Sequence, residues 1–388
     1  MKRLTLILVI AALVAAPLLA QDSVIAPLDP KTARTLGLGG AFVAMSDGYG
    51  SLFGNPAGFA DKGGHLYIPT ASAWLYVAPS SANIEKLESI AGGTATPEES
   101  AAALDELITG NGIGGGAQAG IAWIGGGLGI GLSAVADAYA VGKTALGAVL
   151  DVDTSVQAVL GLGLPLELFG LRLQLGGDIR AFYRAVGTMP FSEVAGLFLG
   201  TGSGEETDVM ATLMAQPATA GYGVALDLGA SLQLGAFKVG LAVRDIAPPF
   251  EMVTATYQDV IDSLAAGGQL PAGTADTFSM LPNIIVGGSF RPWKGGVLDP
   301  NLVVELQDPV SVIRDKASVW GLLHVGAEVR ALGIFVGRAG LNEGWISLGG
   351  GIDLAIVKID AAVFTEELGR RPGDAPRSGF AIDATIRF

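Results

Sequence analysis

The chain has 388 residues and a formal net charge of −14, with 58 glycines, 50% hydrophobic residues, only 15% charged residues and no cysteine. The acidic balance argues against binding to nucleic acid, which requires basic stripes, and the lack of cysteine excludes disulfides and thiolate chemistry. Soluble domains of this size carry fewer glycines and more charge.

The first 20 residues have the layout of a secretory signal peptide. Lys2 and Arg3 precede an apolar run over 4–14, and Ala20 ends the segment before Gln21. The apolar run is short for a membrane span. We therefore predict cleavage near Ala20 and export of the remaining chain.

No later stretch is a convincing transmembrane helix. The nearest candidate, 119–135, is interrupted by glycines at 125–127, 129 and 131, and glycine is a poor helix residue. Because a bilayer accepts only helices and closed barrels, an exported chain this apolar favours a β-barrel.

Alternation with a period of two supports a barrel. In 171–186, the clearest segment, apolar residues alternate with Arg172, Asp178 and Arg180. A helix would spread these charges around its surface, whereas a barrel strand places them on the lumen face. The pattern predicts about 14 strands, an even number as in single-chain bacterial barrels. They run over 65–77, 116–124, 127–139, 151–164, 171–186, 219–234, 236–246, 282–291, 300–308, 319–330, 332–341, 345–354, 357–366 and 378–388.

The connections between these strands alternate in length. The long ones are 78–115, 140–150, 187–218, 247–281, 309–318 and 367–377, and 342–344 is the one short member of this set. Outer-membrane barrels have short periplasmic turns and longer outer loops. We therefore predict that both ends of the barrel domain are periplasmic. Thr96, Pro97 and Glu99 predict a helix start inside the first outer loop.

Apolar residues in the outer loop 187–218 fit two interpretations. Phe198, Leu213 and Met214 are among them. Such residues either pack onto the barrel rim or form a hydrophobic docking surface for a ligand. We treat these three as candidate ligand-binding residues.

Charged residues recur on the polar faces of the predicted strands. The basic ones are Arg172, Arg180, Arg184, Lys238, Arg244, Arg330, Arg338 and Lys358, and the acidic ones are Asp178, Asp227, Glu305, Glu328, Asp353, Asp360 and Asp383. We expect most of them to form ion pairs in the lumen. The alternative is that Arg180 and Arg184 bind a substrate carboxylate, since arginine offers a forked set of donors.

Catalysis and cofactor binding have little support. The chain has two histidines, His65 and His324, and lacks the H-E-x-x-H motif, while Gly-Thr-Gly-Ser-Gly at 200–204 is not G-x-S-x-G. A barrel lipase that uses His and Ser is the one enzymatic alternative. We predict no enzyme activity, no cofactor and no metal site.

Two motifs near the N-terminus resemble a known family. Gly37, Gly39 and Gly40 lie in R-x-L-G-x-G-G-A-F-V-A, which begins at Arg34, and Asn55-Pro56-Ala57 begins N-P-A-G. The pairing resembles the plug (hatch) of the FadL/OmpP1-like outer-membrane transport proteins. The sequence pattern of residues 324–351 is similar to that of the C-terminal strands of these proteins. The plug motif also occurs in PorV-like shuttle proteins of secretion systems and in TraF-like barrels.

The resemblance implies a plug over 21–64 inside an antiparallel, 14-stranded transmembrane barrel over 65–388, after the signal peptide 1–20. It implies passage of long-chain fatty acids or other hydrophobic compounds. It also implies an inward kink of the third strand, beside Asn55-Pro56-Ala57, that opens a lateral window into the bilayer. Glycine suits a kink, and the candidates are Gly127, Gly129 and Gly131. The terminal Phe388 resembles the signal read by the barrel assembly machinery.

These observations together predict an all-β barrel in the outer membrane that takes up hydrophobic or amphipathic small molecules passively. The expected partners are outer-membrane lipid, a hydrophobic ligand and the assembly machinery. One alternative is a scaffold that binds exported proteins, which the length of the connection 78–115 favours. Another is a general porin, against which a plug argues.

Overall fold

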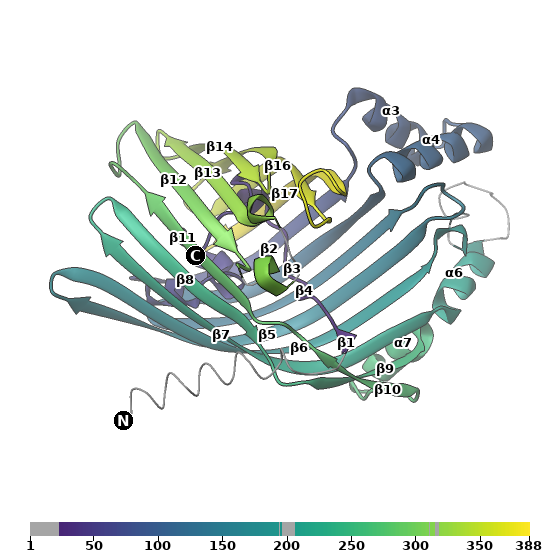
Figure 1. Ribbon diagram of the computed structural model, residues 1–388, viewed down its shortest axis with the longest axis horizontal. Helices are drawn as coiled ribbons and strands as arrows, with labels where there is room; N and C mark the ends of the chain where they lie inside the picture. Colours follow the sequence, from purple (N-terminus) through teal and green to yellow (C-terminus); the bar gives the residue numbers. More distant parts are fainter. Residues whose placement is uncertain (1–22, 194, 196–205, 310, 315–317) are drawn as a thin grey trace.

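The wall of the molecule is a closed ring of antiparallel strands (Figure 1). The computed structural model describes residues 23–193, 195, 206–309, 311–314 and 318–388. Within this part of the chain, 14 strands pair around the ring, and the last of them closes on the first. The predicted 14-stranded barrel is therefore confirmed. The wall strands are β2 (Gly64–Tyr76), β3 (Ile113–Gly125), β4 (Leu128–Val141), β5 (Val149–Leu168), β6 (Leu171–Pro190), β7 (Pro217–Leu234), β8 (Phe237–Ile246), β11 (Asn283–Phe290), β12 (Leu298–Gln307), β13 (Leu323–Ala331), β14 (Phe335–Asn342), β15 (Trp345–Asp353), β16 (Val357–Glu367) and β17 (Pro376–Arg387).

Two short strands extend the wall beyond β8 and β11. β9 (Phe250–Thr256) continues β8 after Ala247-Pro248-Pro249, and β10 (Thr274–Ser279) leads into β11. β9 pairs with both β7 and β10. Proline cannot donate to a sheet ladder, which accounts for the break. The predicted outer loop 247–281 was therefore too long, because the connection between β9 and β10 spans only 257–273.

The turns at one end of the barrel are short, as predicted. They comprise 126–127, 169–170, 235–236, 332–334 and 354–356, with 291–297 the longest connection at this end. In outer-membrane barrels the short turns face the periplasm. The barrel domain also begins and ends here, at Gly64 and Phe388. We refer to this end as the periplasmic end and to the opposite end as the outer end.

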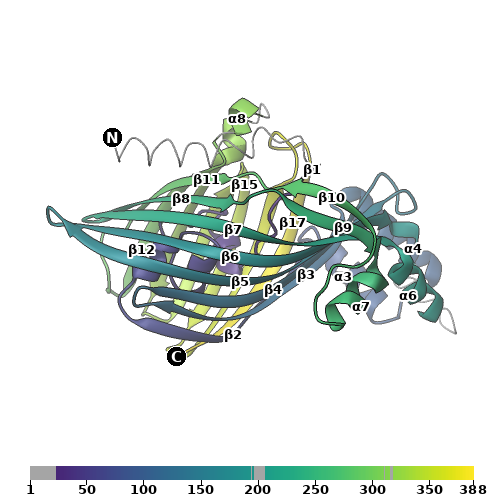
Figure 2. The same cartoon turned by 90° about the horizontal axis from the view of Figure 1, so that it is seen from below.

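The helices α3, α4, α6 and α7 gather along one side of the outer rim (Figures 1 and 2), and α8 lies apart from them. The predicted helix start is confirmed, because the Thr96 side chain accepts from Glu99 N while the Glu99 side chain accepts from Thr96 N. Hydrogen bonds from the Thr96 N–H and the Thr96 hydroxyl hold the pKa of the Glu99 carboxyl below its ordinary value. The outer elements are α3 (Ser81–Ala91), α4 (Pro97–Gly110), η4 (Phe191–Glu193), α6 (Glu206–Ala215), α7 (Tyr257–Ala265), α8 (Ser311–Arg314) and η5 (Val319–Leu322). No helix in the described ranges has the length and apolarity needed to cross a membrane.

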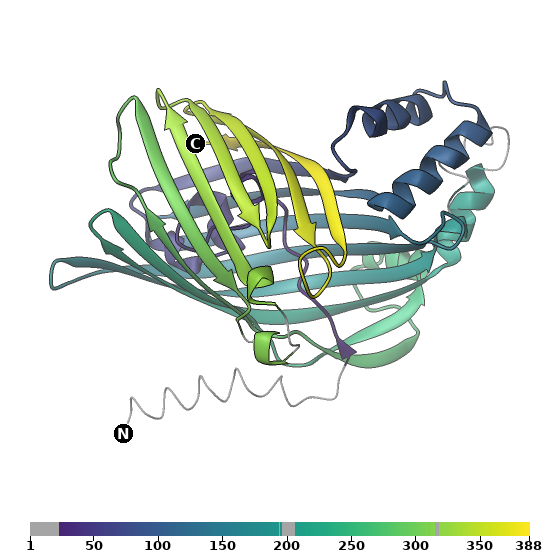
Figure 3. The same cartoon turned by 45° about the horizontal axis from the view of Figure 1, so that its top comes forward.

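The wall is uneven in height, which Figure 3 shows as a tall side and a low side. β5 and β6 have 20 residues each, whereas β14 has 8 and β15 has 9. The tall side carries α3, α4, α6 and α7. The predicted strand 319–330 begins only at Leu323, because the preceding four residues form the 3-10 helix η5.

The third wall strand, β4, runs in unbroken register with both of its neighbours. Gly127 lies in the turn before β4, with φ of +91°. Gly129 and Gly131 face the plug, where added Cβ atoms would lie 2.5 Å from Phe59 Cε1 and 2.5 Å from Leu52 Cδ1 respectively. The small size of Gly129 and Gly131 therefore makes room for the plug, and the kink at these three glycines stays a prediction.

Candidate functional site: the plug and the lumen

A compact plug lies inside the ring (Figure 1). It contains α2 (Ala33–Gly37) and the 3-10 helices η2 (Gly48–Leu52) and η3 (Pro56–Ala60). The Thr32 side chain caps α2 by accepting from Thr35 N, 3.2 Å away. Pro56 occupies the first position of η3, where its missing N–H costs nothing. Short capped turns rather than long helices therefore build the plug.

The glycines of the first plug motif bring the chain close to the wall on the low side. Gly39 and Gly40 have φ of +68° and +84°, a backbone conformation that favours glycine. His324 Nδ1 donates to Gly39 O at 2.8 Å, and Gln307 Nε2 donates to Gly40 O at 3.1 Å. Gly37 lies against Gly349 of β15, so close that an added Cβ would be 3.1 Å from the Gly349 Cα.

Glu305 of β12 anchors the middle of the plug. Its Oε2 accepts from Phe42 N at 2.7 Å and from Val43 N at 2.5 Å. The side chain is 1% exposed, so this carboxylate is the hydrogen-bond acceptor of both N–H groups at a site away from water. The sequence placed Glu305 on a lumen face, but its two backbone partners are about 260 residues away and no local pattern reveals them.

Asn55 fastens the second plug motif to the tall side. Its Nδ2 donates to Val43 O at 3.0 Å and to Ala230 O of β7 at 3.2 Å, while its Oδ1 accepts from Ala57 N at 3.0 Å. Gly176 of β6 lies against Pro56, where an added Cβ would be 2.1 Å from the Pro56 oxygen. The motif therefore docks on β6 and β7 and not, as the resemblance implied, at a kink in the third strand.

Ion pairs connect the plug to the low side of the wall, as predicted for the lumen charges. Arg34 of the plug contacts Asp47 at 2.5 Å and Glu328 at 3.2 Å. Arg338 lies next to them and pairs with Glu328 at 2.8 Å and with Asp360 at 2.6 Å. Desolvation makes such pairs costly to break, since removing one partner leaves a buried charge.

The two arginines proposed to meet a ligand carboxylate already have protein partners. Arg180 is 2% exposed and contacts Asp227, at 3.3 Å, and Asp245. Arg184 pairs with Asp153 and also donates to the Ala26 oxygen. These contacts favour the structural alternative, in which both guanidinium groups hold the wall and the N-terminal segment together.

The segment before the plug fills the outer part of the lumen. β1 (Ser23–Val24) pairs in parallel with β10, after which the chain crosses the interior. Asp29 accepts from Arg244 at 2.7 and 3.1 Å, and Lys31 donates to Glu366 at 2.7 Å. Ile25 packs on an apolar group that we call the Ile25 cluster. This cluster contains Ile25, Phe182, Ala225, Ala247, Phe250, Met252 and Met280.

The candidate ligand residues of the loop 187–218 are only partly described. Phe198 lies outside the described residues. Leu213 is half-buried and packs on a rim cluster that includes Met189 and Phe191, and Met214 is half-buried in the same helix, α6. The contacts of Leu213 agree with packing onto the rim.

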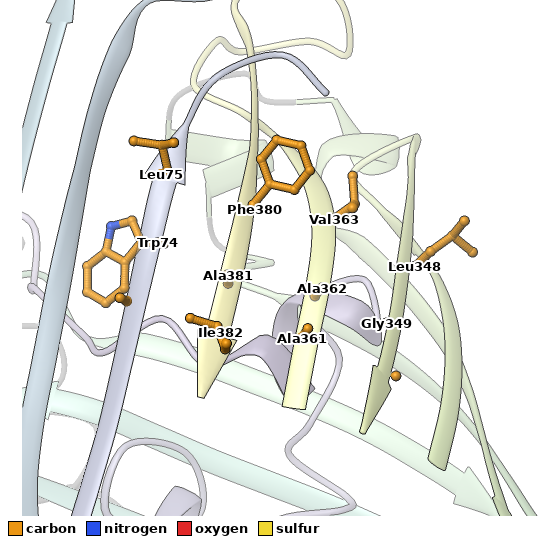
Figure 4. Close-up of a pocket in the computed structure, with 12 residues that line it drawn as sticks. Trp74, Leu75, Leu348, Gly349, Ala361, Ala362, Val363, Phe380, Ala381 and Ile382 are labelled. Atoms are coloured by element: carbon orange, nitrogen blue, oxygen red, sulfur yellow. The ribbon is translucent and has the colours of Figure 1, made fainter. Parts of the chain in front are cut away.

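Two apolar grooves lie on the outside of the wall. One, of about 560 Å³, is bordered by Leu75, Leu348, Val363 and Phe380 (Figure 4). The other, of about 660 Å³, lies over β8 and β11 to β14. Leu348 is 56% exposed, in accordance with an alternation that turns it towards lipid. These grooves therefore face the bilayer and not the lumen.

Neither histidine lies in an arrangement that suggests chemistry. His324 is 4% exposed and donates a hydrogen bond to a backbone oxygen of the plug. His65 is exposed near the periplasmic end. The described residues include no group of His, Asp and Glu side chains arranged to hold a metal ion. Phe388 is 63% exposed and exchanges backbone hydrogen bonds with Leu66 at 2.9 and 3.0 Å. Its role as an assembly signal stays a prediction.

No family model and no curated protein match the sequence. Among solved structures, the chain is similar to the CymD monoaromatic hydrocarbon channel, with 13% identity over 92% of this chain and 96% of that one and a TM-score of 0.51. It is also similar to the Ralstonia pickettii toluene transporter TbuX, with 14% identity over 93% and 98% and a TM-score of 0.49.

A Pseudomonas aeruginosa FadL homologue aligns over 93% of this chain and 98% of its own, with 11% identity and a TM-score of 0.41. At these identities the similarity concerns the fold. A closed ring of strands with apolar outward faces belongs in an outer membrane. The alignment with CymD, at a TM-score above 0.5, therefore shows that the chain has the β-barrel fold of that channel.

Proposed function

We propose that this protein is a passive outer-membrane channel for hydrophobic or amphipathic small molecules. The supporting observation is the Ile25 cluster, an apolar group on the lumen side of the tall wall. Met252 of this cluster is 0% exposed and Phe182 is 4% exposed. A water-filled porin lines its interior with polar side chains, whereas this lumen, besides its ion pairs, offers aromatic and thioether groups to an apolar ligand.

The way the lumen is filled fits selective passage better than general diffusion. Ile25 packs in this apolar group, and the plug lies between β1 and the periplasmic end (Figure 1). The N-terminal segment is held mostly by side chains, such as Arg244 on Asp29. A ligand that displaces this segment gains the apolar contacts that Ile25 makes now, and the plug must then shift for passage.

Uptake measurements test this proposal. Cells lacking their own channels of this fold would express the protein, and uptake of labelled toluene and labelled oleate would be followed separately. Met252→Gln, which places an amide in the Ile25 cluster, should reduce uptake several-fold. Leu146→Gln is the matched control, because Leu146 is 80% exposed on an outer loop. No increase in uptake of either compound on expression would refute the proposal.

One observation favours the alternative function of a scaffold for exported proteins. α3 has no buried residue and projects from the tall side of the rim (Figure 1). A helix that contributes nothing to a core is available to a partner. Native mass spectrometry of the purified protein separates the two functions. An exported protein that co-purifies, and is lost when residues 81–91 are deleted, would support the scaffold.

A further inference from the structure

Two neighbouring cavities lie between the plug and the periplasmic ends of the wall strands. They measure about 320 and 420 Å³. Both are lined by Arg34, Asp47, Asp61, Lys294 and Arg330, so they are adjacent, and we call the two together the periplasmic vestibule. Its charged lining residues are Arg34, Lys62, Arg172, Lys238, Arg291, Lys294, Arg330, Lys358 and Arg387, together with Asp47, Asp61, Asp299, Glu328 and Asp353.

The charge of the periplasmic vestibule is opposite to that of the molecule. Nine basic side chains line it against five acidic ones, whereas the whole chain has a net charge of −14. A concave space lined by an excess of one sign concentrates the field and attracts ions of the other sign. The periplasmic vestibule therefore attracts anions within a protein that repels them elsewhere.

Part of this basic lining is free to bind. Arg34, Arg291 and Arg330 each pair with an acidic residue, and so do Lys358 and Arg387. The remaining four basic residues form no ion pair with any described residue. These are Lys62, Arg172, Lys238 and Lys294.

The periplasmic vestibule continues into the barrel beside the plug. A third cavity of about 110 Å³ shares Arg34, Asp47 and Tyr67 with the larger of the two. It reaches Ser72 of β2 and Asp383 of β17, further along these strands from the periplasmic end. A polar crevice therefore runs between plug and wall and opens into the vestibule at its inner end.

We propose that the periplasmic vestibule is an anion site that receives the carboxylate of an amphipathic ligand at the inner end of its path. The identity of the ligand rests on the proposed function, whereas the affinity for anions rests on the lining residues alone. Arg172 offers forked donors and the lysines offer ammonium groups. A hydrocarbon without a head group gains nothing from them, so the site distinguishes acids from neutral compounds.

The native chain has no cysteine, which allows the local potential to be measured with a single thiol. His65→Cys places the thiol in the periplasmic vestibule, and Leu146→Cys places a reference thiol on an outer loop. Both would react with anionic sulfonatoethyl and cationic trimethylammonioethyl methanethiosulfonate. The ratio of the anionic to the cationic rate should be about tenfold higher at position 65, since a potential of about kT/e changes this ratio roughly sevenfold.

Two triple variants test which residues create the potential. Lys62→Gln, Arg172→Gln and Lys294→Gln together should lower the rate ratio at position 65 about threefold or more at physiological salt. The matched control replaces three exposed basic residues of the outer loops, Lys143, Arg370 and Arg371, by glutamine. An equal ratio at positions 65 and 146, or an equal effect of the two triple variants, would overturn the anion site. Neither reaction depends on transport.

Protection experiments then test the occupant of the periplasmic vestibule. Decanoate should slow the anionic reagent at position 65 several-fold, and decan-1-ol should not. Protection by inorganic phosphate but not by decanoate would overturn the amphiphile as occupant, and equal protection by decanoate and decan-1-ol would overturn recognition of the carboxylate. Uptake that fails while decanoate still protects would count against the proposed function and not against this site.

Discussion

Removing the Glu305 carboxylate should release the plug without unfolding the barrel. Glu305→Ala leaves the Phe42 and Val43 N–H groups, now 2.7 and 2.5 Å from Oε2, without an acceptor. An unpaired buried donor costs about 1–3 kcal/mol. Two such donors weaken docking by about 3 kcal/mol, since water reaches them once the plug shifts. At a factor of ten per about 1.4 kcal/mol, the undocked population should rise roughly a hundredfold.

Single-channel recording in planar bilayers measures this population as the frequency of open events. Glu305→Gln keeps one acceptor oxygen and should raise the frequency no more than about tenfold, because bonds to neutral acceptors are weaker. Asp353→Ala is the control, since the described residues that pair with Asp353 are Arg330 and Arg387, both of the wall. The reasoning fails if Glu305→Ala opens no more often than Asp353→Ala while gel mobility shows a folded barrel.

Three further outcomes follow from contacts described above or from the turn after β14. Gly176→Val should undock the plug and raise its protease sensitivity, whereas Gly177→Val, on the lipid side of the same strand, should not. Arg180→Ala should destabilise the barrel by about 3–5 kcal/mol in urea unfolding, because it leaves buried carboxylates unpaired. Arg172→Ala should change stability by less than about 0.5 kcal/mol, because Arg172 forms no ion pair with any described residue. Burial and neighbouring carboxylates raise the pKa of Glu343 to about 7, because they disfavour its ionised form in the folded turn. The turn should therefore lose stability as pH rises from about 4.5 to 7. Its protection from hydrogen exchange, corrected for intrinsic rates, should fall over the same range. Glu343→Gln should remove this pH dependence.

Period-two alternation is a local property, which is why the sequence predicted the strand number and the turn lengths. The alternation breaks where Pro248 and Pro249 interrupt the ladder. The residues of β9 and β10 were therefore predicted as part of an outer loop. Glycine was ambiguous for a different reason. The same residue allows a strand to kink and allows another segment to approach closely, and at Gly129 and Gly131 the plug makes the close approach.

The contacts of the site were less accessible to prediction than the elements that carry them. Alternation placed Arg180 and Glu305 on the lumen face, but a face does not specify a partner. Arg180 meets Asp245, a residue at a φ of +61°, and Glu305 meets two backbone N–H groups that carry no side-chain signal. The excess of basic residues at one end was equally hidden, because it is assembled from the ends of several strands and their turns.

The uneven wall has a consequence for the membrane around it. At about 3.3 Å per residue and a tilt near 40°, a strand of 20 residues such as β5 rises about 50 Å, well beyond the roughly 25 Å apolar band of such barrels. A strand of 8 residues such as β14 rises only about 20 Å. Lipid beside β14 must thin to match it, so the leaflets are locally compressed and less ordered on that side. The protein thus imposes its own asymmetry on the bilayer.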